Sequence, residues 1–93
     1  MTRVVRVAPE ARGDITRLID FLIERDVGAA GRARETIAAA LGSLAELPDR
    51  GRLISASYRE LPVKFGRYGY AIRYRVTLDE VFVSRIFHTR ERR

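Results

Sequence analysis

The spacing of apolar residues changes once along this chain of 93 residues, and that change limits the fold more than any other feature. Between residues 10 and 47 apolar side chains recur at the spacing of one helix face. Gly28 interrupts the pattern, so we expect two helices joined by a short connection, which makes them antiparallel neighbours. The apolar positions are Ala11, Ile15, Leu18, Ile19 and Leu22 in the first helix, and Ala30, Ala33, Ile37, Leu41 and Leu44 in the second.

Strands are predicted before and after this helical hairpin. Residues 3–8 are rich in valine and end at Pro9, while from Tyr58 onward apolar and polar residues alternate with period two. The alternation predicts strands at 58–65, 70–76 and 81–88, with residues 49–57 as a loop. Pro62 cannot donate a ladder hydrogen bond, so its strand is expected at an edge or with a bulge. The predicted fold class is α+β: an N-terminal strand, an antiparallel helical hairpin, then three antiparallel strands forming a small sheet, in one domain spanning residues 1–93.

The last strand pair predicts which side chains share a face of the sheet. If Val76 faces Val81 across the turn, antiparallel pairing places Ile72 opposite Arg85 on the face toward the helices. An arginine on that face breaks the pattern. Either Arg85 lies near the end of the sheet and reaches solvent, or the register is shifted by one residue. The opposite face is predicted to carry Arg73, Arg75 and His88.

Composition excludes several classes of protein. With no cysteine and one histidine, disulfides, a thiolate nucleophile and cysteine-ligated zinc are excluded, and we expect neither a metal site nor a cofactor. The longest uncharged stretch, residues 36–45, is about half of the roughly 20 residues that a membrane span needs. The N-terminus lacks the apolar core of a secretory signal, so a cytoplasmic protein without membrane contact is expected.

Positive charge is concentrated in the second half of the chain. Residues 1–48 hold seven arginines against seven acidic residues, whereas residues 49–93 hold eleven basic against five acidic residues, which gives 11 − 5 = +6. All basic residues except Lys64 are arginine, whose planar fork suits phosphate and carboxylate. The partner is therefore expected to be anionic, either nucleic acid or an acidic protein surface. A codon preference of the genome explains the use of arginine in place of lysine equally well. It explains the concentration of positive charge in the second half of the chain less well.

His88 is the residue best suited to acid–base chemistry. Its ordinary pKa is near neutral, and with Arg73 and Arg90 nearby it fits a metal-independent cleavage of RNA, in which it takes the 2′-hydroxyl proton. The alternative is that His88 only hydrogen-bonds the backbone at a strand end. Asp14, with Asp20 and Glu24, is placed on a solvated helix face and forms no catalytic dyad, while Tyr70 and Tyr74 are expected in the core and Tyr68 in a turn.

Several short segments, taken in order, resemble the RelE/ParE toxins of bacterial toxin–antitoxin modules. They are Ala8-Pro9-Glu10-Ala11, Leu61-Pro62-Val63, Gly66-Arg67-Tyr68, Ile72-Arg73-Tyr74-Arg75-Val76 and Arg85-Ile86-Phe87-His88. The resemblance covers essentially the whole chain. It implies a type II toxin that is neutralised by a cognate antitoxin encoded next to it.

The resemblance leaves two activities open. RelE-like members are ribosome-dependent mRNA endonucleases, whereas ParE-like members act on DNA gyrase. Arg59 and Arg90 match basic catalytic positions of RelE, but Ala71 replaces an expected arginine and the C-terminal tyrosine segment of RelE has no counterpart. The hydrophobic-His pair at the end of the last strand is similar to ParE. We therefore expect gyrase inhibition by protein–protein contact, with mRNA cleavage, or a generic RNA- or DNA-binding module, as alternatives.

Three sets of site residues follow from the resemblance and the charge pattern. An endonuclease would use His88, Arg73 and Arg90. Target binding is assigned to Arg59, Arg67, Arg85, Arg90, Arg92 and Arg93. Antitoxin binding is assigned to Ile15, Leu18, Leu22, Ile37, Leu41, Arg73 and Arg75, because an acidic amphipathic segment would lay apolar residues on the helical hairpin and carboxylates against the arginines.

Overall fold

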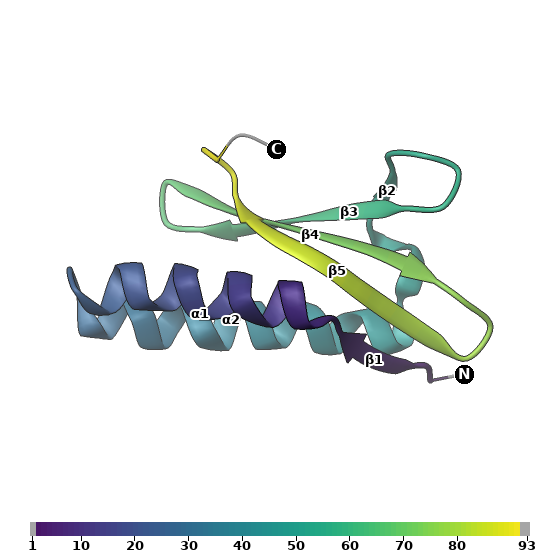
Figure 1. Cartoon of the computed structure of the whole chain (residues 1–93), viewed down its shortest axis with the longest axis horizontal. Helices are drawn as coiled ribbons and strands as arrows, with labels where there is room; N and C mark the ends of the chain where they lie inside the picture. The colour runs from purple at the N-terminus through teal and green to yellow at the C-terminus, as the bar shows by residue number, and fades with distance from the viewer. Residues whose placement is uncertain (1, 92–93) are drawn as a thin grey trace.

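The computed structural model describes residues 2–91 and has two helices packed on one face of a five-stranded sheet (Figure 1). The predicted α+β class is confirmed, and the opposite face of the sheet is left open by the elements described (Figure 1). In chain order the elements are β1 (Val4–Val7), α1 (Pro9–Ile23), α2 (Val27–Glu46), the 3-10 turn η1 (Pro48–Arg50), β2 (Arg52–Leu53), β3 (Arg59–Phe65), β4 (Tyr68–Val76) and β5 (Glu80–His88).

The helical hairpin lies where the apolar period predicts it. Pro9 occupies the first position of α1, where its missing N–H costs nothing and its fixed φ suits a helix. Asp26 caps α2, because its side-chain oxygen accepts a hydrogen bond from the Ala29 N–H at 3.0 Å. Pro48 follows the end of α2 and begins the 3-10 turn. None of the helices in the described part of the chain is both long and apolar enough to cross a lipid bilayer.

The sheet has the strand order β1-β5-β4-β3-β2, so the first and last strands lie side by side. β1 runs parallel to β5, and the other neighbouring pairs are antiparallel. The expected loop at 49–57 contains most of η1 and all of β2, two elements too short for any periodicity to indicate. Pro62 lies beyond the part of β3 that β2 covers, which confirms that the strand is an edge at that position.

A bulge in β5 changes the predicted register. Val76 pairs with Val81 as expected, but Ser84 is an extra residue, so that the pairing beyond it is shifted by one. The predicted pairing of Ile72 with Arg85 is therefore wrong, and the alternative of a one-residue shift is correct. The pairs after the bulge are Arg73 with Arg85, Ile72 with Ile86, Ala71 with Phe87, and Tyr70 with His88.

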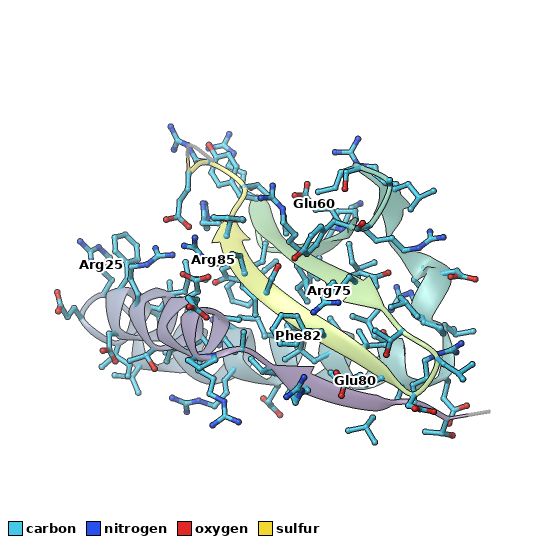
Figure 2. All side chains as sticks on the ribbon, turned by 45° about the vertical axis from the view of Figure 1, so that its right-hand side comes forward. Arg25, Glu60, Arg75, Glu80, Phe82 and Arg85 are labelled. Carbon is cyan, nitrogen blue, oxygen red and sulfur yellow. The ribbon has the colours of Figure 1, made fainter. Side chains whose placement is uncertain are left out.

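The bulge moves two side chains to faces opposite to those predicted. Arg85 lies with Arg73 on the open face, the face that also carries Arg75 and Phe82 (Figure 2). His88 lies on the helix face, because it pairs with the buried Tyr70. The prediction that His88 shares a face with the two arginines of β4 is therefore wrong.

The core lies between the hairpin and the sheet. Tyr70 and Tyr74 are 2% and 0% exposed, as predicted. The Tyr74 hydroxyl donates to the Pro48 carbonyl at 2.7 Å and accepts from the Gly51 N–H at 2.8 Å, which ties η1 to the sheet. The largest fully buried side chains are Tyr74, Ile37, Leu44, Ile72, Ile86, Val81 and Val83.

Candidate functional site

A cleft of about 750 Å³ lies between α1, the β3–β4 turn and the end of β5. Its apolar wall comes from both layers of the fold, with α1 on one side and the sheet on the other. The apolar and aromatic residues that line it are Leu18, Phe21, Leu22, Phe65, Tyr68 and Tyr70. The polar and charged lining residues are Arg17, Arg67, His88, Arg90 and Glu91.

Glycines set the shape of the turn that closes one end of this cleft. Gly66 has φ of +60°, a conformation that residues with a side chain rarely adopt. Gly69 faces the backbone of β3 so closely that an added Cβ would lie 2.1 Å from the Val63 carbonyl oxygen. The Gly69 carbonyl also accepts from the Thr89 N–H at 2.9 Å, which holds the end of β5 beside this turn.

His88 is partly buried in the cleft and its ring contacts two tyrosines. Its ring centre lies 5.9 Å from that of Tyr68 and 5.8 Å from that of Tyr70, the second with edge-on geometry. Its Nδ1 accepts the Arg90 backbone N–H at 3.2 Å. The expected alternative role, a backbone hydrogen bond at a strand end, is thus present.

The side chain of Arg90 covers part of the cleft mouth. Its guanidinium carbon lies 5.0 Å from the centre of the Tyr68 ring, a cation–π distance. Arg67 and Tyr68 are exposed and line the same cleft. The cleft therefore combines an apolar interior with cationic side chains at its mouth.

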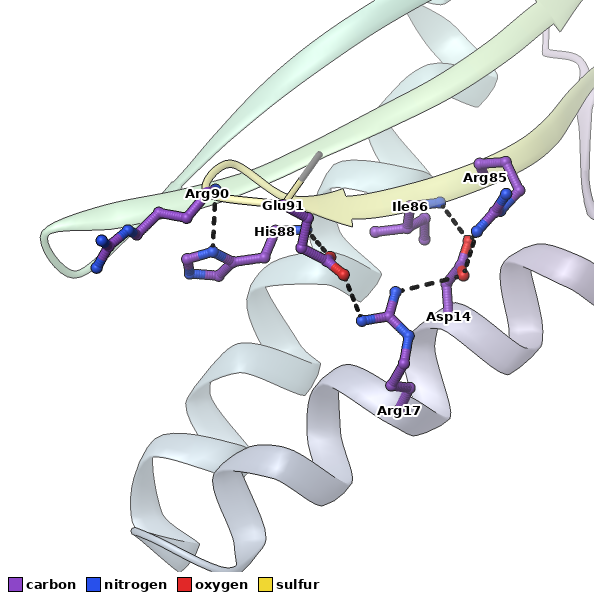
Figure 3. A network of polar contacts seen from close by, with 7 residues as sticks. All are labelled: Asp14, Arg17, Arg85, Ile86, His88, Arg90 and Glu91. Atoms are coloured by element: carbon purple, nitrogen blue, oxygen red, sulfur yellow. Dashed lines mark hydrogen bonds and ion pairs between the residues drawn. The ribbon is translucent and has the colours of Figure 1, made fainter. Parts of the chain in front are cut away.

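A chain of charged groups joins α1 to the C-terminal turn (Figure 3). Glu91 Oε1 accepts the His88 N–H, and Oε2 accepts from Arg17 Nη1, both at 2.6 Å. Arg17 Nη2 also reaches Asp14 Oδ1 at 3.4 Å. The turn that presents Arg90 is thus held by an acidic side chain that is itself fixed to α1.

Asp14 is the best-connected member of this network. Its two oxygens accept from Arg85 Nε and Nη2 at 2.8 and 3.0 Å, and Oδ2 also accepts the Ile86 N–H at 2.9 Å (Figure 3). Burial alone would raise the pKa of the Asp14 carboxyl, but these hydrogen bonds and the charge of Arg85 outweigh it and lower the pKa below its ordinary value of 3.8. The prediction of a solvated Asp14 is wrong, since the residue is 5% exposed.

The predicted catalytic set is not assembled on one surface. His88 lies on the helix face and Arg73 on the open face of the sheet, where Arg73 Nη2 contacts Glu60 Oε2 at 3.3 Å. Of the two arginines in the predicted catalytic set, Arg90 lines the cleft together with His88 and Arg73 does not. Within residues 2–91 no cluster of three or more histidine or acidic side chains is suited to holding a metal ion.

The residues predicted to bind the target fall into separate groups. Arg67 and Arg90 line the cleft, whereas Arg85 is held by Asp14. Arg59 is also occupied, because it donates to the Gly51 carbonyl at 2.7 Å. Arg92 and Arg93 lie outside the described residues.

The residues predicted to bind the antitoxin are likewise divided. Leu18 and Leu22 line the cleft, Ile15 and Leu41 are partly buried against the core, and Ile37 is only 2% exposed, so it has almost no surface to offer. Arg73 and Arg75 lie on the open face. Several cleft residues have no site role in the predictions from sequence, among them Arg17, Phe21, Phe65 and Glu91.

The chain is similar to bacterial toxins in sequence and to a solved toxin–antitoxin structure in fold. It is 45% identical over 93 residues to "Toxin RelE1" of Caulobacter vibrioides, with both chains covered completely. It is 44% identical over 89 residues to "Toxin RelE3" of the same organism, covering 96% of this chain and 97% of the relative. A solved chain described as "Chromosomal ParDE TA system from P. aeruginosa" superposes with a TM-score of 0.78 at 18% identity, covering 94% of this chain and 96% of the other, which shows the shared fold.

The family model described as "ParE toxin of type II toxin-antitoxin system, parDE" matches residues 5–93. The match includes both helices, the whole sheet from Val5 onward and the cleft. It also implies a cognate antitoxin as a partner. The chain therefore belongs to the ParE family of toxins of type II toxin–antitoxin systems.

Proposed function

We propose that this toxin inhibits DNA gyrase by protein–protein contact, using the cleft and its cationic mouth. The observation that carries the proposal is that His88 and Arg73 project from opposite faces of the sheet. Cleavage of RNA needs a base and charge-stabilising groups around one phosphate, and these two groups cannot surround one phosphate from opposite faces. A mode of action without bond cleavage needs no such arrangement.

The chemistry of the cleft supports a protein partner. The cores of protein–protein interfaces are enriched in aromatic residues and arginine. Two aromatic residues and an arginine, Phe21, Tyr68 and Arg90, line this one cleft. Phe21 is 55% exposed and Tyr68 is 44% exposed, so both offer apolar area that is not used by the core. An acidic rim on the target would complement Arg67 and Arg90.

The same cleft accounts for neutralisation by the antitoxin. Leu18 and Leu22, two of the residues expected to bind it, line the cleft together with Arg67 and Arg90. An acidic amphipathic segment that fills the cleft would bury these leucines and pair with the arginines, so that target and antitoxin exclude each other. On this proposal the antitoxin acts by direct competition.

The test is inhibition of DNA supercoiling by purified gyrase in the presence of the purified toxin. Arg90→Glu reverses one charge at the cleft mouth and is expected to raise the toxin concentration for half-inhibition by about tenfold, equal to about 1.4 kcal/mol. Arg34→Glu is the matched control, because Arg34 is exposed on α2 and does not line the cleft. Unchanged supercoiling at high toxin excess would refute the proposal.

The competing function is ribosome-dependent cleavage of mRNA, favoured by one observation: His88, Arg90 and Tyr68 share the cleft. It is tested in parallel by primer extension on a message during cell-free translation. The proposal predicts intact message with the wild-type toxin and with His88→Ala alike. Cleavage that His88→Ala abolishes would replace gyrase inhibition by the endonuclease function.

A further inference from the structure

The open face of the sheet holds a second concave surface, separate from the cleft. It has a volume of about 430 Å³ and lies where the β5 bulge meets the loop before β3. Its lining residues are Ile54, Ser55, Tyr58, Arg73, Ser84 and Arg85. Two arginines and three hydroxyl groups thus surround one recess, which we call the bulge recess.

The bulge places two cations side by side in this recess. Arg73 and Arg85 are direct cross-strand partners on the open face, an arrangement of like charges that is destabilising unless something compensates it. Their guanidinium carbons lie 5.2 and 4.9 Å from the centre of the Phe87 ring, so both flank the same aromatic side chain. Cation–π contact fixes their positions but does not neutralise their charge.

The carboxylates that accompany these arginines lie on the outer sides of the pair. Across the sheet the order is Glu60 on β3, Arg73 on β4, Arg85 on β5 and Asp14 on α1. The two acidic side chains are each 6% exposed, and the two cations meet in the middle of the row. The buried Nε–H of Arg73 makes no hydrogen bond, which costs free energy. An oxyanion entering between the guanidinium groups would contact both of them on the side away from Glu60 and Asp14 and, after a small turn of the Arg73 guanidinium, accept that N–H.

We propose that the bulge recess binds a carboxylate side chain of an acidic protein segment. The recess favours a single carboxylate over a chain of phosphates, because its lining supplies only two cations and each of them is already paired with a buried carboxylate. Ile54, which is 39% exposed, and Tyr58 add an apolar wall that suits a peptide. The antitoxin implied by the family is the protein expected to supply this acidic segment. The proposal does not depend on gyrase being the target of the toxin.

The experiment uses the full-length toxin and NMR of the arginine Nε–H groups, at mildly acidic pH where their exchange with water is slow. The probes are a hexaglutamate peptide and a uridine hexanucleotide. Hexaglutamate is expected to shift the Nε–H signals of Arg73 and Arg85 saturably, and more tightly than the oligonucleotide does. Tighter binding of the oligonucleotide at these signals would overturn the choice of a carboxylate, and no shift with either probe would overturn the site.

Two variants test whether binding needs the planar guanidinium group of Arg73 or only its positive charge. Arg73→Lys keeps the charge and removes the Nε–H, and it is expected to weaken hexaglutamate binding about fivefold, as for one lost charge-assisted hydrogen bond. Arg6→Lys is the matched control, because Arg6 on β1 pairs with Phe82 on the same face of the sheet and lies outside the recess, and it should bind like wild type. Equal binding by all three proteins, or equal weakening by both variants, would refute the bulge recess. The Arg73 signal in the wild-type protein tests the proposal even if a variant does not fold.

Discussion

Replacing Asp14 by alanine would remove the group that closes the edge of β5 beyond the bulge. β1 pairs with β5 only as far as Val83, after which α1 begins and Asp14 supplies acceptors to the exposed strand edge. The carboxylate accepts the buried Ile86 N–H and both donors of the Arg85 fork. Asp14→Ala therefore leaves one backbone donor and one cation without their acceptor.

The expected cost follows from these contacts. A buried N–H without a partner costs about 1–3 kcal/mol. The fork of Arg85 adds only about 1 kcal/mol, because its side chain is 44% exposed and water replaces part of the lost contact. We expect Asp14→Ala to lower the free energy of unfolding by about 3 kcal/mol in total. For a domain of this size that corresponds to a fall in melting temperature of about 10–20 °C.

The pH dependence has a definite sign. The pKa of Asp14 is lower in the folded protein than its ordinary value of 3.8, so the stabilisation is complete above that value and is lost as the pH falls through the folded pKa. The difference in stability between wild type and Asp14→Ala is therefore constant near neutral pH. It should narrow only from about pH 4 down to the lower folded pKa, the range in which the carboxyl of the unfolded chain is protonated while that of the native protein is still ionised.

Urea denaturation followed by circular dichroism, at neutral pH and at a series of acidic pH values, measures both effects. Asp20→Ala is the matched control, because Asp20 is an exposed aspartate of the same helix, and it should change stability by less than about 0.5 kcal/mol. The reasoning fails if Asp14→Ala costs no more than this control. It also fails if the difference from wild type is the same at acidic and at neutral pH.

Three further changes test other parts of the fold. Tyr74→Phe removes the acceptor of the buried Gly51 N–H and is expected to lower the free energy of unfolding by about 1–3 kcal/mol in urea titrations; a change within error would contradict that assignment. Gly69→Ala places a Cβ 2.1 Å from a carbonyl oxygen of β3 and should abolish the cooperative thermal transition; a melt like that of wild type would show that the strands can separate. Glu91→Gln loses only the ion pair with Arg17, so a loss under about 1 kcal/mol is expected in low salt and none in high salt, and a salt-insensitive loss would refute the ionic origin.

The predictions from sequence are accurate where one local signal determines the structure. Pro9 and Pro48 mark a helix start and a helix end, and the helices begin and end within two residues of them. Gly28, expected in the connection between the helices, is instead the second residue of α2. Alternation likewise locates the three long strands. β2 has only two residues, which is too few to show an alternation of apolar and polar side chains. Its pairing with β3 depends on contacts with residues further along the chain.

The site was harder to predict because it depends on one extra residue in β5. Ser84 itself resembles an ordinary strand residue, and the misplaced Arg85 beside it is the one hint of a shift, which moves every later side chain of the strand to the face opposite to that predicted. His88 thereby leaves the predicted arginine surface and enters the cleft. Phe21 and Glu91 were missed because an exposed aromatic residue and a C-terminal acid are unremarkable in a sequence.

Two departures from the hydrophobic pattern, however, explain each other. Asp14 follows Ala11 by three positions and precedes Leu18 by four, so it lies on the buried stripe of α1. Arg85 occupies a strand position where the alternation predicted an apolar residue. In the structure these two side chains form a bidentate ion pair. A buried-face acid and a misplaced arginine in one small domain therefore predict a contact between their elements, and here that contact fixes the packing of α1 against the last strand.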